Sequence, residues 1–178
     1  MSQNLKDKNV AILAVDGFEQ AELVEPRDAL KAAGARAVIV SAKTDPIQGM
    51  HHDKKGDTFD VDLIFAQADA DHFDAVVLPG GVVNADEIRM HPKAQQFVKD
   101  MVAQDKPVAV ICHGAWLLIS ANVVRDRRIT SFPSLKDDLN NAGARWEDAE
   151  VVEDGVFISS RTPDDLPAFN AALIKALS

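Results

Sequence analysis

The chain has 178 residues, of which 47% are hydrophobic and 26% charged; this composition is ordinary for a globular protein and excludes disordered and fibrous classes. Its formal charge of −9 and the scarcity of clustered Lys and Arg argue against a nucleic-acid partner, and the basic residues 125–128 are interpreted as a solvated turn. A single cysteine, Cys112, excludes an internal disulfide, and the Cys and His spacing indicates neither a zinc site nor another metal site.

The N-terminus is too polar for a signal peptide, and no stretch approaches the roughly 20 apolar residues needed to cross a bilayer. We therefore expect a protein of the cytoplasm with no membrane partner. The length suits one core, and the chain contains no internal repeat or linker-like stretch. The expected organisation is a single domain over residues 1–178.

Short apolar runs alternate with helical patterns along the chain. Unbroken valine-rich runs are typical of strands buried on both faces of a parallel sheet. Proline near the start and glycine or proline after the end delimit the helices, and Pro26 is expected at a first helical position. In chain order we predict strand 10–15, a helix within 25–34 that ends before Gly34, strands 36–42 and 75–79, a helix within 91–107 that ends before Pro107, strand 107–111, a β-hairpin over 151–160 and a last helix over 163–177.

This order predicts the α/β class, with a doubly wound, mostly parallel sheet covered by helices. Ligands of such sheets bind beyond the carboxyl ends of the strands. The segments at that edge are "DGFEQAE", "GGVVNADE" and "CHGA". A carboxylate, a glycine-rich loop and a thiol are therefore expected to meet there.

Cys112 stands where a predicted strand gives way to a helix. Free N–H groups at a helix start stabilise a thiolate and lower the thiol pKa from its reference of about 8.5. Gly114, two residues later, allows a sharp turn, as in the second half of a nucleophile elbow. The alternative is a cysteine buried as a small hydrophobe. Its position favours the reactive interpretation.

His113 is the obvious base, although adjacent helical side chains point apart, so contact with the thiol requires an unusual backbone at Cys112. Glu19 is the candidate acid. Beside the sulfur it would need to keep its proton, with a raised pKa; alternatively it is a charge at a helix start. Glu22 and Glu25 are interpreted as solvent-facing or helix-start charges.

Gly80 and Gly81 follow a strand and can present N–H groups to an oxyanion, although paired glycines also mark any tight loop. The two histidines of "GMHHDKKGD" are interpreted as exposed loop residues. Trp116 and Trp146 are expected in the core.

Taken together, "DGFEQAELVEPRDALKAAG", "FDAVVLPGG", "KPVAVICHGAWLLISA", "ITSFPSLKDDLNNAGARWEDAEVVEDG" and "SSRTPDDLPAFN" cover most of the chain. In this order they resemble the PfpI intracellular-protease-like family, relatives of Parkinson disease protein seven within the class I glutamine amidotransferase-like superfamily. The resemblance implies a flavodoxin-like sandwich and no cofactor.

The resemblance also implies a nucleophilic Cys112 at a strained elbow, followed by a catalytic His113. The carboxyl group hydrogen-bonded to the sulfur maps onto Glu19. An acidic residue from a neighbouring subunit maps onto Asp86, or onto Glu87 if the loop is aligned one residue differently. A homodimer or a larger homo-oligomer is therefore the expected assembly.

Backbone N–H groups near Gly81 and Ala115 would form the oxyanion hole, with Gly80 and Gly114 as structural residues. Two positions depart from the family pattern. Ala115 replaces a common proline, and Asp126 replaces a turn glycine, which implies a local stability cost if the backbone there is left-handed.

Three activities follow from the resemblance. Action on glyoxal, methylglyoxal or their protein adducts ranks first, because it needs only a thiolate, a nearby acid or base and oxyanion donors. Peptide hydrolysis ranks second, because the adjacent Cys and His must be aligned. A non-enzymatic redox sensor, working through oxidation of Cys112, is the third alternative.

Overall fold

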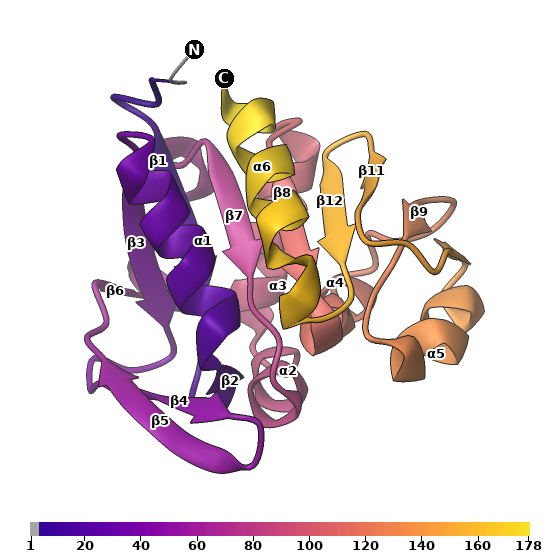
Figure 1. The fold of residues 1–178 in the computed structure, drawn as a ribbon, viewed down its shortest axis with the longest axis horizontal. Helices are drawn as coiled ribbons and strands as arrows, with labels where there is room; N and C mark the ends of the chain where they lie inside the picture. Colours follow the sequence, from indigo (N-terminus) through magenta and orange to yellow (C-terminus); the bar gives the residue numbers. More distant parts are fainter. Residues whose placement is uncertain (1–3) are drawn as a thin grey trace.

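In the computed structural model, which describes residues 4–178, a seven-stranded sheet lies between two layers of helices (Figure 1). All neighbouring strands are parallel except the edge strand β11, which runs antiparallel to β12. The spatial order is β11 (Val152–Asp154), β12 (Phe157–Ser160), β8 (Val108–Ile111), β7 (Ala75–Leu78), β1 (Asn9–Leu13), β3 (Arg36–Ser41) and β6 (Leu63–Ile64). The predicted doubly wound, mostly parallel sheet is confirmed, with the four apolar runs at its centre.

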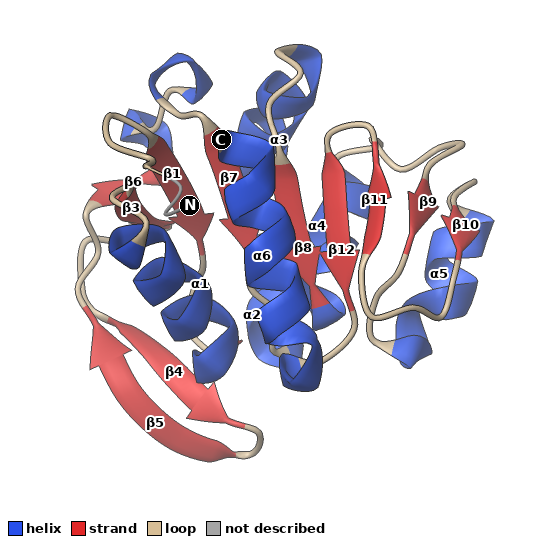
Figure 2. Ribbon diagram, turned by 45° about the horizontal axis from the view of Figure 1, so that its top comes forward, coloured by secondary structure: helices blue, strands red, loops and turns tan. Residues whose placement is uncertain are grey.

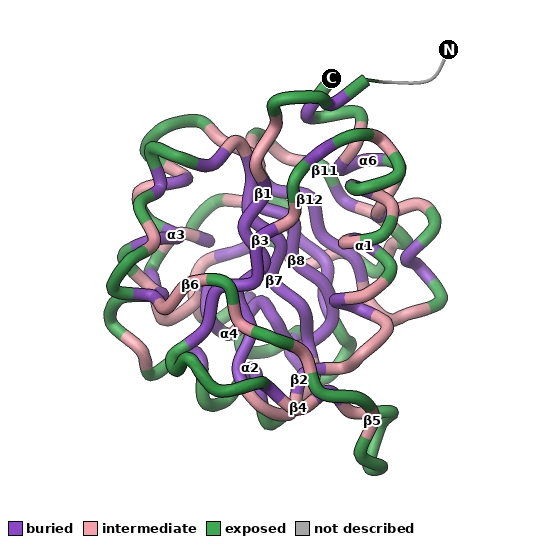
Figure 3. The backbone as a smooth tube through the Cα atoms, turned by 90° about the vertical axis from the view of Figure 1, so that its left-hand side faces the viewer, coloured by how far each residue is buried: buried purple, intermediate pink, exposed green. Residues whose placement is uncertain are grey.

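Helices cover both faces of this sheet (Figure 2). On one face lie α1 (Gln20–Ala32) and α6 (Leu166–Leu177), and on the other lie α2 (Val82–Ile88), α3 (Pro92–Ala103) and α4 (Ala115–Ser120). The central strands are therefore buried along their length (Figure 3), which explains why their sequences are apolar at every position rather than at alternate ones.

The start of α1 differs from the prediction, with consequences for the site. The helix begins at Gln20, directly after the short strand β2 (Phe18–Glu19), so Pro26 lies inside it and not at its first position. Proline in a helix interior removes one backbone hydrogen bond. Burial of Leu23 and Leu30 on the sheet side offsets that loss.

A hairpin that the sequence analysis took for a loop projects from the body of the fold. It consists of β4 (Ile47–His51) and β5 (Lys54–Phe59), and β4 pairs in parallel with β2 (Figure 1). Gln20 fastens it to α1, because its Nε2 donates to Asp57 Oδ2 over 2.8 Å and its Oε1 accepts from the Asp57 N–H over 2.7 Å. These bonds hold the hairpin turn near the carboxyl edge of the main sheet.

The C-terminal third confirms the predicted hairpin and last helix. β12 pairs with β11 of the hairpin on one side and in parallel with β8 on the other, which sets Ser160 opposite Ile111. A second parallel pair, β9 (Arg128–Ile129) and β10 (Arg145–Trp146), lies beside α5 (Lys136–Asn141). Short 3-10 turns occupy Phe65–Gln67, Ala70–His72, Cys112–Gly114, Pro133–Leu135 and Pro163–Asp165.

Three smaller observations complete the comparison with the sequence. Trp116 and Trp146 pack against the core but are only partly buried. Asp126 has φ 64°, the left-handed conformation on which the expected stability cost depends. Among the described residues, none of the helices has both the length and the apolar character needed to span a membrane.

Candidate active site

The strand β8 ends in a sharp turn at Cys112. This residue has φ 60°, a conformation that costs energy in residues with a side chain, and it opens the 3-10 turn that leads into α4. The Phe132 N–H donates to the Cys112 carbonyl over 3.2 Å. A Cβ at position 114 would lie 2.7 Å from the Leu78 carbonyl oxygen, so only glycine fits there. The geometry agrees with the predicted strained elbow.

The unusual backbone brings two adjacent side chains together. Cys112 Sγ lies 3.2 Å from His113 Nδ1. Burial lowers the pKa of His113, so its imidazole is neutral at pH 7 and can accept a proton. The Phe132 ring stacks on the imidazole at a centroid distance of 4.7 Å. Nε2 lies 3.3 Å from Ser134 Oγ, a neighbour that the sequence analysis did not single out.

Glu22, not Glu19, supplies the carboxyl group beside the sulfur. It is fully buried, it lies close enough to the Cys112 thiol for each group to shift the pKa of the other, and its Oε2 accepts from the Gly80 N–H over 2.6 Å, while its Oε1 has no hydrogen-bond partner among the described residues. Burial raises the pKa of Glu22 to about 8, the charge of Glu19 adds to the effect, and the Gly80 N–H opposes it. Glu22 therefore keeps its proton at pH 7.

The carboxyl group that the resemblance placed on Glu19 is therefore that of Glu22 in the structure. With α1 starting at Gln20, Glu19 is the residue before the helix, and its carboxylate accepts from the His52 N–H in the hairpin turn over 3.1 Å. Glu22 falls in the first turn on the face toward the sheet. The interpretation of Glu22 as solvent-facing is corrected accordingly.

The electrostatics of Cys112 also differ from the expectation. Burial raises the pKa of the thiol, and an ionised Glu22 would raise it further, while the N–H groups of His113 and Gly81 oppose both effects. The expected net lowering is therefore not found. Repulsion by Glu22 is absent while that acid is neutral. The thiol proton then has a natural acceptor in the His113 imidazole, 3.2 Å away.

Two backbone N–H groups lower the pKa of the Cys112 thiol. They belong to Gly81, which has φ 87° and was predicted as an oxyanion donor, and to His113. The Ala115 N–H instead donates to the His113 carbonyl within the 3-10 turn. At Gly80, a Cβ would lie 2.5 Å from Glu22 Oε2 and 2.7 Å from Cys112 Cβ, so the loop approaches the pair closely only because this residue is glycine.

A cavity of about 600 Å³ opens above the sulfur. Its walls come from the start of α1, the hairpin turn, the start of α2, Phe132 and residues 162–164. Apart from Glu22 its carboxylates are Glu19 and Asp164, and within residues 4–178 its lining contains neither lysine nor arginine. The cavity is large enough for a ligand well beyond the size of a small aldehyde.

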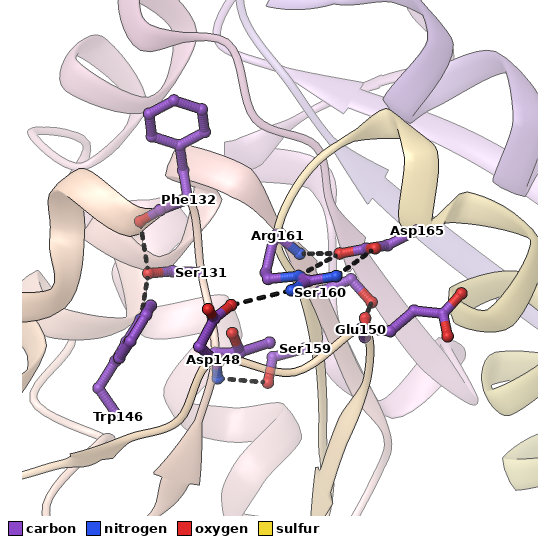
Figure 4. A network of polar contacts seen from close by, with 10 residues as sticks. Ser131, Phe132, Trp146, Asp148, Glu150, Ser159, Ser160, Arg161 and Asp165 are labelled. Atoms are coloured by element: carbon purple, nitrogen blue, oxygen red, sulfur yellow. Dashed lines mark hydrogen bonds and ion pairs between the residues drawn. The ribbon is translucent and has the colours of Figure 1, made fainter.

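One wall of the cavity is held by the polar network of Figure 4. The Arg161 guanidinium donates to both oxygens of Asp165 over 2.9 and 3.0 Å and to Asp148 over 2.8 Å, which fixes the segment carrying residues 162–164. On the other side, Trp146 Nε1 donates to Ser131 Oγ over 2.9 Å, and Ser131 Oγ donates to the Phe132 carbonyl over 2.9 Å. The ring that stacks on His113 is thereby anchored.

The two acidic residues expected from a neighbouring subunit lie on α2 and are exposed. Glu87 Oε1 lies 4.0 Å from His91 Nε2. Approach of Asp86 or Glu87 to His113 across an interface stays a prediction. In the described part of the chain, His, Cys, Asp and Glu do not form a group of three or more suited to a metal ion.

Comparisons with known proteins agree with this architecture. The model of the DJ-1/PfpI family matches residues 8–176. A protein of Pyrococcus abyssi named a deglycase is 47% identical, over 94% of this chain and 98% of its own length. The Bacillus subtilis protein YraA, named a putative cysteine protease, is 37% identical over 96% of this chain and 98% of its own length.

Among solved structures, a two-domain protein of Anabaena variabilis with DJ-1/ThiJ/PfpI-like and ferritin-like domains superimposes with a TM-score of 0.91 and 35% identity. The match covers 96% of this chain and 48% of that protein, so this chain corresponds to about half of it.

Proposed function

This chain belongs to the DJ-1/PfpI family, and from its site we propose that it is a cysteine-dependent enzyme that acts on glyoxal, methylglyoxal or their protein adducts. The observation that carries the proposal is one cluster: Cys112 Sγ at 3.2 Å from a neutral His113 Nδ1, with the protonated Glu22 on the same sulfur. The name of the Pyrococcus abyssi relative, a deglycase, supports it.

The reaction begins when His113 Nδ1 takes the thiol proton while Sγ attacks the aldehyde carbon. The carbonyl π electrons move to oxygen, where the Gly81 N–H beside the sulfur stabilises the negative charge, and the imidazolium then returns the proton to give a hemithioacetal. The carbon-bound proton then moves to the neighbouring carbonyl carbon, and the hydroxyl proton of the hemithioacetal moves to the oxygen of that carbonyl, which gives a thioester of the hydroxy acid. Water hydrolyses this thioester and restores the thiol.

Glu22 and His113 are the groups placed to move these protons, because His113 contacts the sulfur, Glu22 is coupled to the thiol by their mutual pKa shifts, and both are neutral at pH 7. An adduct on a side-chain amine must in addition release the amine, which takes a proton as it leaves. The 600 Å³ cavity leaves room for the side chain that carries such an adduct.

Self-association forms part of the proposal. Val82 and Val83, at the cavity mouth, are 53% and 62% exposed, and Asp86 follows on the same helix. A second copy that covers these residues would bring an acidic side chain near His113. Sedimentation of the native protein and of Asp86→Asn tests this arrangement, and we expect dimers or larger assemblies. In an activity assay, we expect slower turnover by Asp86→Asn than by wild type. A location in the cytoplasm stays a prediction.

Peptide hydrolysis is the second candidate. Two observations favour it: the contact between the thiol and a neutral imidazole, which suits acyl transfer, and the name of the Bacillus subtilis relative. Both activities need Cys112 and His113. The two activities differ in their need for Glu22, because acyl transfer to a thiol does not require a second proton carrier at the sulfur.

The test compares wild type, Cys112→Ser, His113→Ala and Glu22→Gln on methylglyoxal and on a fluorogenic peptide, with the exposed Glu25→Gln of the same helix as the matched control. We expect no methylglyoxal turnover in Cys112→Ser and a loss of about 10²-fold in Glu22→Gln. Turnover that survives in Cys112→Ser refutes the proposal. Oxidation of Cys112 without turnover of either substrate by wild type would favour the redox sensor.

A further inference from the structure

Asn84 is buried completely behind the glycine turn of the site, and neither the sequence analysis nor the proposed reaction uses it. Its Oδ1 accepts from the Val15 N–H over 2.8 Å, at the end of the first strand. Its Nδ2 donates to the carbonyl oxygens of Pro79 and Gly80 over 3.2 and 3.0 Å. One side-chain amide thus joins two neighbouring strand ends.

The two carbonyl groups that Asn84 holds belong to the two peptide units that serve the active site. The Pro79 carbonyl shares a peptide plane with the Gly80 N–H, which donates to Glu22 Oε2 over 2.6 Å. The Gly80 carbonyl shares a plane with the Gly81 N–H, which lowers the pKa of the Cys112 thiol. Because a peptide unit is planar, fixing its oxygen also fixes the direction of its N–H.

We propose that Asn84 is a positioning residue that aims the Gly80 N–H at the Glu22 carboxyl and the Gly81 N–H at the Cys112 sulfur. The turn needs such a support, because Gly81 adopts φ 87° and neighbours a second glycine, so neither residue restricts the backbone itself. Hydrogen bonds accepted by a carbonyl also polarise the peptide and strengthen its N–H as a donor. This inference deepens the proposed function but does not require turnover.

The first experiment measures the thiol. Asn84→Ala removes both donors, and Asn141→Ala, on the exposed end of α5, is the matched control. We expect the rate of iodoacetamide alkylation at pH 7 to fall about tenfold in Asn84→Ala and the thiol titration midpoint to rise by about one pH unit, as for loss of one hydrogen bond to a charged group. The control should match wild type. A folded Asn84→Ala with unchanged alkylation and midpoint overturns the proposal.

A second experiment uses the native side chain and decides the matter if Asn84→Ala does not fold. In wild type, the NMR signals of the Asn84 side-chain amide and of the Gly80 and Gly81 amides are followed against pH. We expect all three to shift with one midpoint as the Cys112–Glu22 pair ionises, and Cys112→Ser to remove or move that midpoint for all of them. A Gly81 amide that responds while the Asn84 side chain does not overturns the proposal.

These readouts separate the positioning role from the enzymatic proposal. If wild type turns over neither aldehyde nor adduct, but alkylation still slows in Asn84→Ala, the proposed function fails and the role of Asn84 stands. If methylglyoxal turnover is normal in a folded Asn84→Ala and its thiol is unchanged, the proposed function stands and the role of Asn84 fails.

Discussion

Replacing Glu22 by Gln should change how the stability of the protein depends on pH. In the folded state the pKa of Glu22 is raised from 4.5 to about 8, chiefly by burial, so between these values the folded chain binds a proton that the unfolded chain lacks. Stability from this group is therefore complete below pH 4.5 and is lost as the pH rises to about 8. Glutamine cannot ionise, and its side chain has the shape of a protonated glutamate.

The size of this change in the free energy of unfolding follows from the difference between the pKa values of Glu22 in the unfolded and folded states. Each pH unit is worth about 1.4 kcal/mol, so wild type should lose about 4 to 5 kcal/mol relative to Glu22→Gln between pH 4.5 and about 8. Urea unfolding at pH 5, 6, 7 and 8 measures the difference, with the exposed Glu25→Gln as the control that should follow wild type. Parallel stability profiles of wild type and Glu22→Gln would refute the reasoning.

Three further predictions concern the site, the turn at Asp126 and the hairpin. The pH profile of kcat/KM should be bell-shaped. Its acid limb should lie below pH 6.5, because the pKa of His113 is lowered. Its alkaline limb should lie near the Glu22 pKa of about 8 and should be absent in Glu22→Gln. Asp126→Gly should raise the free energy of unfolding by about 0.5–1 kcal/mol in denaturant titrations, because φ is 64° there; a decrease would contradict the assigned strain. Gln20→Ala should speed hydrogen exchange of the Asp57 amide about tenfold, since it removes the acceptor of that N–H; unchanged exchange would show that the clamp does not hold the hairpin.

The central sheet could be predicted from the sequence because strands covered on both faces are apolar along their buried stretches. The valine-rich runs that became β1, β3, β7 and β8 carry this signal without ambiguity. The hairpin β4–β5 carries no comparable signal. It is polar, largely exposed and held by the Gln20–Asp57 clamp, which joins residues far apart in the chain.

The structure brings together the predicted site residues that are neighbours in the chain, and it differs from the prediction for the acid, whose position depends on helix phase. Cys112 and His113 are neighbours, and the positive φ at Cys112 is the one condition that the sequence could name but not establish. The choice between Glu19 and Glu22 depends on where α1 begins. Because the helix starts six residues before Pro26, the acid that meets the sulfur is the one three residues further along.

Asn84 and Ser134 illustrate a different limit of sequence reasoning. Both are small polar residues, and both contact groups distant in the chain: Asn84 Oδ1 accepts from the Val15 N–H, and Ser134 Oγ lies 3.3 Å from His113 Nε2. Residue type and local spacing contain no information about those contacts. The "PGG" turn is itself a signal, however, since two successive glycines need an outside support if their N–H groups are to point in fixed directions.

The most direct measurement is the infrared difference spectrum of wild type minus Glu22→Gln, recorded across pH. A protonated carboxylic acid and a carboxylate have separate C=O bands, so the spectrum reports the charge of this one side chain. The account predicts the band of the protonated acid at pH 6 and its disappearance with a midpoint near 8. A midpoint near the ordinary value of 4.5 would mean that Glu22 is ionised beside Cys112 at pH 7, and would contradict it.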